Sequence, residues 1–210
     1  MLNKNDKQNI AISYNNVAHE RNEYKNDMWE VNERTKFMDL LNSINSKSLL
    51  DAGAGNGWDS LFFKEQGFDV VSIDISDEMI YLCREKGLNA IVMDFYKLKF
   101  KDGTFDAIWS LNSMLHVSKE DFPIVLDEFN RVLKSDGLLY IGIFGGFDRE
   151  GVLQGDNQIP KRFFNAYADE NIKKAVSQQF EIIKYENIDV NKNTVHLQSL
   201  ILKKRHIVKK

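Results

Sequence analysis

Short apolar runs alternate with longer amphipathic stretches along the middle of the chain, from about residue 48 to residue 144. The runs are rich in valine, isoleucine and leucine and favour buried strands, whereas the stretches between them carry apolar residues at helical spacing. The expected strands are Ser48–Ala52, Asp69–Ile73, Ala90–Met93, Phe105–Ser110 and Leu138–Phe144. The expected helices between them are Trp58–Gln66, Asp77–Lys86 and Lys119–Lys134. This alternation predicts an α/β fold, a doubly wound and mostly parallel sheet with helices on both faces.

The N-terminal flank adds two further elements. Residues 1–46 are rich in asparagine and charge, and Ile10, Tyr14 and Val17 recur there at helical spacing. The pattern predicts two amphipathic helices, the second beginning after Asp27. These helices form either a packing cap or a lid over a ligand, and the sequence favours neither.

The C-terminal flank begins with a long polar connection after residue 144, and such connections often carry function. A helix is expected near Asp169–Gln178. Two strands, Phe180–Val190 and Thr194–Lys203, then predict an antiparallel pair at one edge of the sheet.

A glycine-rich segment directly follows the first expected strand. Gly53, Gly55 and Gly57 occupy alternate positions after Asp51. Glycine permits positive φ and leaves no Cβ between backbone and ligand, and the helix that follows adds free amide donors. A dinucleotide fingerprint needs its last glycine one position later, where this chain has Trp58. The spacing therefore disfavours a site for the pyrophosphate of a dinucleotide.

Three aspartates stand where successive strands are expected to end, and open α/β sheets bind ligands outside those ends. Asp51 closes the first strand, Asp74 the second and Asp94 the third. Asp74 lies about 20 residues beyond the glycine loop, where a carboxylate can accept both hydroxyl hydrogens of a ribose. Ile75 could pack on an adenine face, and Asp94 with Phe95 could contact its amino edge. Each aspartate could instead cap a helix, but three in register favour a shared ligand.

Four runs of sequence are arranged as in one known family. They are Leu50–Gly57, Val71–Ser76, Phe105–Ser110 and Phe129–Leu139. In this order they resemble successive motifs of the class I S-adenosylmethionine-dependent methyltransferases, of the type 11-like kind that acts on small molecules. The resemblance covers residues 49–144 and implies a Rossmann-like, seven-stranded, mostly parallel sheet with an N-terminal helical cap. We expect a single domain that consists of a helical cap (1–46), a cofactor-binding core (47–144) and a substrate-side loop with terminal antiparallel strands (145–210).

The resemblance also implies that the cofactor is S-adenosylmethionine, that the product is S-adenosylhomocysteine, and that both bind at the same site. In the family, the glycine loop borders the methionine part, the acid of the second strand holds the ribose, and a lead-in helix closes over the cofactor. The residues expected at the cofactor are Tyr14, Asp51, Ala52, Gly53, Gly55, Gly57, Asp74, Ile75, Asp94, Phe95, Leu111 and Asn112.

The segment after the fourth strand, Leu111–His116, is expected to line the methyl-transfer site. His116 is the candidate catalytic residue, as a base or as a hydrogen-bond partner of the substrate, although it could also only orient the following helix. Glu150 and Arg162 are candidates for binding a polar substrate, and Phe163 for walling the pocket. No metal site is expected.

Composition and charge narrow the possible acceptors. The chain has 43% hydrophobic and 28% charged residues, which is ordinary for a globular protein. Its net charge of −3 disfavours binding to nucleic acid. Ser110-Leu111-Asn112-Ser113 stands where amino-directed DNA methyltransferases carry an Asn/Asp-Pro-Pro-Tyr-like motif. Cys83, the single cysteine, falls inside an expected helix, so it is expected to be a buried structural thiol and not the nucleophile of a cytosine methyltransferase.

We expect a cytoplasmic protein without a membrane span, because the chain has a single cysteine, a polar N-terminus and no long apolar run. We also expect a monomer or a homodimer. The function we infer from the sequence is methyl transfer from S-adenosylmethionine to an O, N or S atom of a small molecule. The alternatives are a tRNA or protein methyltransferase, a non-catalytic cofactor-binding regulatory module and, less favoured, an NAD-dependent oxidoreductase.

Overall fold

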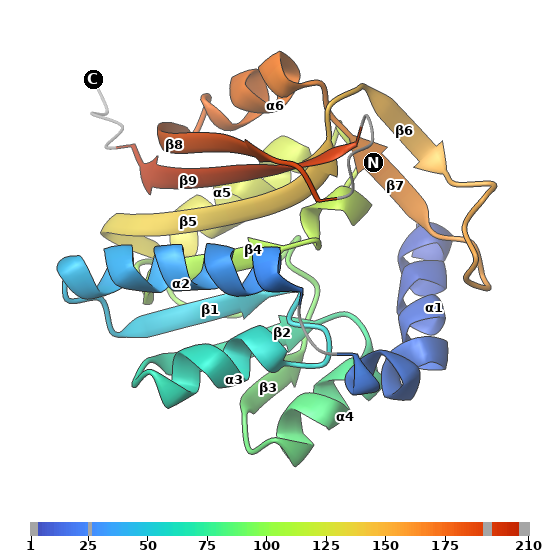
Figure 1. Ribbon diagram of the computed structural model, residues 1–210, viewed down its shortest axis with the longest axis horizontal. Coiled ribbons are helices and arrows are strands. Elements are labelled where there is room, and N and C mark those ends of the chain that lie inside the picture. Colours follow the sequence, from blue (N-terminus) through green and yellow to red (C-terminus); the bar gives the residue numbers. More distant parts are fainter. Residues whose placement is uncertain (1–3, 25–26, 191–194, 206–210) are drawn as a thin grey trace.

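The computed structural model describes residues 4–24, 27–190 and 195–205, and its main feature is a seven-stranded sheet (Figure 1). The strand order is β3-β2-β1-β4-β5-β9-β8. These strands are β1 (Ser48–Ala52), β2 (Asp69–Asp74), β3 (Asn89–Val92), β4 (Phe105–Leu111), β5 (Leu133–Gly145), β8 (Phe180–Ile188) and β9 (His196–Lys204). The helices are α1 (Lys4–Glu23), α2 (Met28–Ser43), α3 (Trp58–Glu65), α4 (Asp77–Glu85), α5 (Phe122–Val132), α6 (Asp169–Val176) and the 3₁₀ turn η1 (Met114–His116).

The strand directions fix the position of the ligand crevice. Strands β1 to β5 pair in parallel, whereas β9 is antiparallel to both β5 and β8. Strand β1 lies between β2 and β4, so the chain reverses its direction of travel across the sheet at β1. A crevice outside the carboxyl ends of β1 and β4 follows from this topology. The expected Rossmann-like sheet and its antiparallel edge are confirmed.

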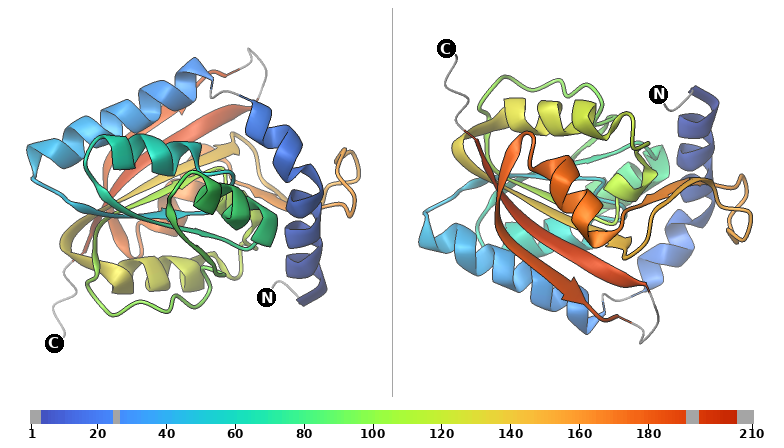
Figure 2. Two further views of the ribbon diagram at one scale, coloured as in Figure 1. Left: turned by 90° about the horizontal axis from the view of Figure 1, so that it is seen from below. Right: turned by 90° about the horizontal axis from the view of Figure 1, so that it is seen from above.

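Helices cover both faces of the sheet, with α2 and α3 on one face and α5 on the other (Figure 2). On the first face, Phe37 of α2 and Phe63 of α3 pack against the buried Trp109 and Tyr140 of the sheet. On the other face, α5 contributes Phe129 to the largest buried cluster. Apolar side chains on both faces bury most of the central strands β1 and β4.

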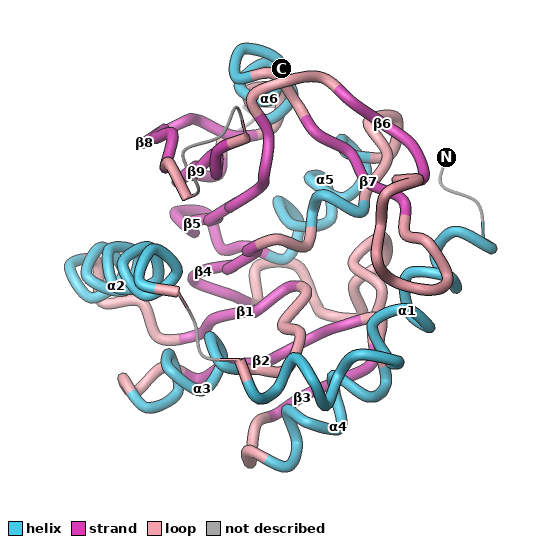
Figure 3. Tube along the Cα trace, turned by 45° about the vertical axis from the view of Figure 1, so that its right-hand side comes forward, coloured by secondary structure: helices cyan, strands magenta, loops and turns pink. Residues whose placement is uncertain are grey.

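The first helix of the predicted cap has a different role. Helix α1 lies beside the carboxyl ends of the parallel strands (Figure 3). It is held to α4 through the side chains of Asn15 and Asp77, 2.5 Å apart, and through a cluster of Ala18 with Met79 and Leu82. Its apolar stripe therefore faces the crevice, while the second helix, α2, packs on the sheet.

The connection after β5 is more ordered than expected. It contains a second, two-stranded sheet of β6 (Arg149–Val152) and β7 (Phe163–Ala166), which the sequence pattern did not predict. Helix α5 also begins later than expected, at Phe122, because residues 118–121 form a turn in which Ser118 Oγ accepts the Asp121 N–H at 3.1 Å. Pro123 at the start of this helix suits a first turn. Among the described residues, no helix is long and apolar enough to cross a membrane.

Candidate active site

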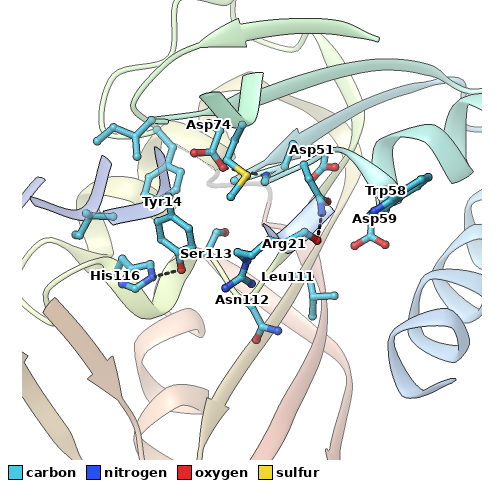
Figure 4. Close-up of a pocket in the computed structure, with 18 of the residues that line it drawn as sticks. Tyr14, Arg21, Asp51, Trp58, Asp59, Asp74, Leu111, Asn112, Ser113 and His116 are labelled. Carbon is cyan, nitrogen blue, oxygen red and sulfur yellow. Dashed lines mark hydrogen bonds between the residues drawn. The ribbon is translucent and has the colours of Figure 1, made fainter. Parts of the chain in front are cut away.

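A pocket of about 500 Å³ lies between α1 and the carboxyl ends of the strands (Figure 4). Its lining comes from α1, the glycine loop and the ends of β2, β3 and β4. The residues expected from sequence that line it are Tyr14, Asp51, Gly53, Gly55, Asp74, Ile75, Asp94, Phe95, Leu111, Asn112 and His116. Those outside the lining are Ala52, Gly57, Glu150, Arg162 and Phe163.

The three glycines of the loop have different physical roles. A Cβ on Gly53 would lie 2.2 Å from Ser113 Cβ, and one on Gly57 would lie 2.8 Å from Cys83 Sγ. Both positions also have positive φ, 84° and 85°. A Cβ on Gly55 would meet no heavy atom within 4 Å. Gly53 and Gly57 therefore let the loop pack closely on the protein itself, whereas Gly55, which also lines the pocket, has open space at its Cβ position.

Asp74 is held rigidly at the end of β2. One carboxylate oxygen accepts the Gly55 N–H at 2.9 Å, and the other accepts the Ser76 N–H at 2.9 Å. Burial raises the pKa of Asp74, and the same backbone donors oppose that rise. Each oxygen keeps a lone pair, so two neighbouring hydroxyl groups of a ligand could both donate to this carboxylate.

Asp51 is a buried carboxyl at the end of β1. Burial raises its pKa to about 8, helped by the nearby negative charge of Asp59, while the Ser60 hydroxyl, 2.6 Å away, opposes the rise. In the free protein at neutral pH this carboxyl therefore holds its proton. A ligand ammonium beside it would favour the charged form.

We expect Asp51→Asn to remove a pH dependence from the free protein. The pKa rises from 3.8 in the unfolded chain to about 8 in the folded one, so the folded state keeps a proton that the unfolded state loses. This contribution to the free energy of unfolding is fully present below pH 3.8 and is lost as the pH rises to 8. The variant should gain stability over the wild type between pH 5 and pH 8, by about 1 to 3 kcal/mol. Thermal melts across that range test this, and parallel curves for the two proteins would contradict it.

The far end of the pocket is apolar apart from one ion pair. Ile75 and Phe95 line it, and the Phe95 ring packs edge-on against Phe129 at 6.0 Å. The Asp94 carboxylate pairs with the Lys7 ammonium at 2.8 Å, and the same ammonium lies 3.1 Å from the centre of the Tyr96 ring. A flat base with an exocyclic amino group suits this end of the pocket.

The segment after β4 carries a strained residue. Asn112 has φ 53°, an uncommon value for a residue other than glycine, and such values concentrate at functional sites. Its side-chain oxygen is buried and makes no hydrogen bond within the described part of the chain. Ser113 beside it donates from Oγ to the Ala52 carbonyl at 2.8 Å, which ties this segment to the glycine loop. Ala52 therefore contributes to the pocket through its carbonyl group, which accepts the Ser113 hydrogen bond.

His116 is held from both sides. Its Nε2 lies 2.7 Å from the Tyr14 hydroxyl, and its Nδ1 lies 2.7 Å from the Phe163 carbonyl oxygen. Burial lowers the pKa of His116 to about 4, so the ring is neutral at physiological pH. Phe163, expected as a pocket wall, instead contacts His116 through its backbone.

The two expected substrate-binding charges lie outside the pocket. Glu150 accepts the Lys119 N–H at 2.7 Å on the exposed surface. Arg162 pairs with the buried Asp156 at 2.7 Å, and its guanidinium lies 5.0 Å from the centre of the Tyr14 ring. Arg162 therefore reaches the site through Tyr14, and direct substrate binding by either residue stays a prediction.

Other charged residues that line the pocket were not expected from sequence. They include Lys7 and Arg21 of α1, Glu30 of α2 and Asp59 of α3. Arg21 follows Tyr14 by seven positions, which is two helical turns, so the periodicity of α1 could have indicated it. Figure 4 shows its side chain directed into the pocket. No group of His, Cys, Asp and Glu side chains within residues 4–24, 27–190 and 195–205 could hold a metal ion.

Comparison with known proteins agrees with this geometry. Residues 50–141 match the family model described as a methyltransferase domain. This chain belongs to the class I S-adenosylmethionine-dependent methyltransferases. Its relatives include a malonyl-[acyl-carrier protein] O-methyltransferase of Hamiltonella defensa, 30% identical over 62% of this chain and 50% of the relative. A glycine/sarcosine N-methyltransferase of Aphanothece halophytica is 30% identical over 81% of this chain and 66% of the relative.

A solved structure supports this fold over nearly the whole length of the chain. The 1,6-didemethyltoxoflavin-N1-methyltransferase of Burkholderia thailandensis, solved with S-adenosylhomocysteine, matches with a TM-score of 0.72 and 18% identity over 94% of this chain and 88% of that one. The chain spans about half the length of the malonyl-directed relatives that it matches. The family and the fold are therefore shown, and the acceptor is a separate question.

Proposed function

We propose that this methyltransferase transfers a methyl group from S-adenosylmethionine to an O, N or S atom of a small molecule. The observation that carries the proposal is the alignment of Asp74, Asp94 and the Leu111–His116 segment around one pocket. These groups suit a ribose, an adenine and the end of the ligand where a methyl group leaves. The relatives named above include both an O-methyltransferase and an N-methyltransferase, so they leave the accepting atom open.

The residues of the pocket fit the cofactor on three grounds. The Asp74 carboxylate has both oxygens fixed by backbone donors, the loop at Gly55 leaves open space, and Asn112 presents an oxygen without a partner in the described chain. Asp51 offers a carboxyl group for an ammonium. When bound, the sulfonium supplies an activated methyl group, and alignment is the main task left to the protein. The protein's contribution is to orient the acceptor and to exclude water from the pocket between α1 and the ends of the strands.

Ligand-induced stabilisation tests the proposal. Because a ligand that binds the folded state raises its stability by mass action, S-adenosylhomocysteine and S-adenosylmethionine should each raise the melting temperature. NAD should have no effect. A shift with NAD and none with either sulfur ligand would overturn the proposed function in favour of an oxidoreductase. Binding without transfer to any molecule of a cell extract would favour a regulatory module.

A further inference from the structure

The hydrogen bonds around His116 have a fixed direction. A backbone carbonyl can only accept, so the Nδ1 atom that lies 2.7 Å from the Phe163 oxygen must carry a proton. A neutral imidazole has one N–H, and Nε2 is then the acceptor. The Tyr14 hydroxyl, 2.7 Å from Nε2, must therefore donate its only hydrogen to His116.

This direction sets what Tyr14 can offer to an acceptor molecule. With its hydrogen committed to His116 and one lone pair engaged by the Arg162 guanidinium, the Tyr14 oxygen keeps one lone pair for a ligand. Both Tyr14 and His116 line the pocket, next to Asn112 of the segment where the methyl group would leave (Figure 4). A carboxylate or a thioether has no hydrogen to donate, so neither would find a partner at this oxygen. An N–H or O–H group could donate a hydrogen bond to it.

The charges around Tyr14 then separate an amine from a hydroxyl. An alcohol or phenol must lose its proton to become a strong nucleophile, whereas a neutral amine attacks through its own lone pair. His116 is a poor base for that proton, because its Nε2 lone pair already accepts the Tyr14 hydrogen, and burial lowers its pKa to about 4. The Arg162 and Arg21 guanidinium groups lie 5.0 and 5.5 Å from the centre of the Tyr14 ring. These positive charges favour the neutral amine over its ammonium form, although Arg162 is paired with Asp156 and the Asp74 carboxylate acts in the opposite direction.

We propose that the acceptor is a primary or secondary amine whose N–H donates to the Tyr14 oxygen, with His116 holding Tyr14 in place. This inference rests on the proposed function and adds the class of substrate. The nitrogen lone pair forms the new N–CH₃ bond as the C–S electron pair returns to sulfur. The product ammonium then releases its extra proton to solvent. His116 is thus a positioning residue that keeps its protonation state throughout.

Two-dimensional ¹H–¹⁵N spectra of the imidazole side chains test the direction of the hydrogen bonds without any turnover. The free protein should show His116 in the Nδ1–H tautomer at neutral pH. Tyr14→Phe should shift the Nε2 resonance of His116. The matched control Tyr81→Phe, at a half-exposed tyrosine of α4 outside the pocket, should leave it unchanged. A proton on Nε2, or a His116 signal that is indifferent to Tyr14→Phe, would overturn the proposal.

Labelling of the small-molecule fraction of a cell extract tests the acceptor class. With radiolabelled S-adenosylmethionine, the labelled products should be amines whose N-methyl group survives mild alkali. Tyr14→Phe should slow labelling about 10- to 100-fold, since one hydrogen bond to the acceptor is lost. It should change the affinity for S-adenosylhomocysteine by less than about twofold, because the ring is kept. Tyr81→Phe should label at the wild-type rate.

The outcomes separate this inference from the proposed function. Label in methyl ethers, in alkali-labile methyl esters or in thioethers, or an unchanged labelling rate in Tyr14→Phe, would overturn the amine assignment while leaving methyl transfer in place. A wild-type protein that does not bind S-adenosylhomocysteine would overturn the proposed function itself.

Discussion

Asp74→Ala is expected to weaken the binding of S-adenosylhomocysteine by roughly 30- to 1,000-fold. The wild-type carboxylate is fixed by two backbone donors, from Gly55 and Ser76, and can accept two further hydrogen bonds from ribose hydroxyl groups. Hydrogen bonds to a charged group contribute about 1.5 to 3 kcal/mol each, and some of that is lost again to solvent. Isothermal titration calorimetry measures the change. Asp69→Ala, at the exposed opposite end of the same strand, is the control and should bind normally.

The loss must arise from the ribose contact and not only from a loosened glycine loop. An analogue of S-adenosylhomocysteine without the ribose 2′-hydroxyl separates these causes as a double-mutant cycle does. The wild type should prefer the natural ligand clearly, and Asp74→Ala should bind the two ligands almost equally. If Asp74→Ala keeps the wild-type affinity within about threefold, Asp74 does not hold the ribose.

The sequence predicted the parallel part of the fold well because its strands are buried on both faces. Such strands are continuous apolar runs with sharp polar ends, and β1 was predicted with its exact bounds at Ser48–Ala52. The hairpin of β6 and β7 was missed because it has no such pattern. Arg149–Val152 is mostly exposed and contains Glu150 and a glycine, and it is a strand because β7 pairs with it.

Some residues of the candidate site could also be predicted from the sequence, and others could not. Asp74 and Asp94 could be predicted to share one pocket because parallel strands end at a common edge of the sheet. Periodicity could place Lys7 and Arg21 on the same face of α1 as Tyr14, but it could not show that this face lies against that edge. The role of Gly57 was also beyond the sequence, because the close approach of Cys83 and Leu88 is a tertiary contact. Local periodicity thus locates residues on elements, and only packing decides which of them meet.

Gly53→Ala is expected to lower the free energy of unfolding by about 2 to 5 kcal/mol and to abolish measurable binding of S-adenosylhomocysteine. Gly53 combines a φ of 84° with a site for Cβ only 2.2 Å from Ser113 Cβ. An alanine would therefore both strain the backbone and push the end of β4 away from the glycine loop. That movement would displace Asn112 and His116 together. Urea denaturation and calorimetry measure the two effects.

Two control variants assign the loss to its cause. Gly67→Ala has a similar φ of 89° but no heavy atom within 4 Å of its Cβ, so it isolates the backbone strain and should cost about 1 kcal/mol. Ser113→Gly in the Gly53→Ala background removes the atoms that clash, since Ser113 Cα lies 3.6 Å away, an ordinary contact. This double variant should recover much of the stability and part of the binding. If it recovers neither, the close packing of the glycine loop on the end of β4 does not explain why position 53 needs glycine.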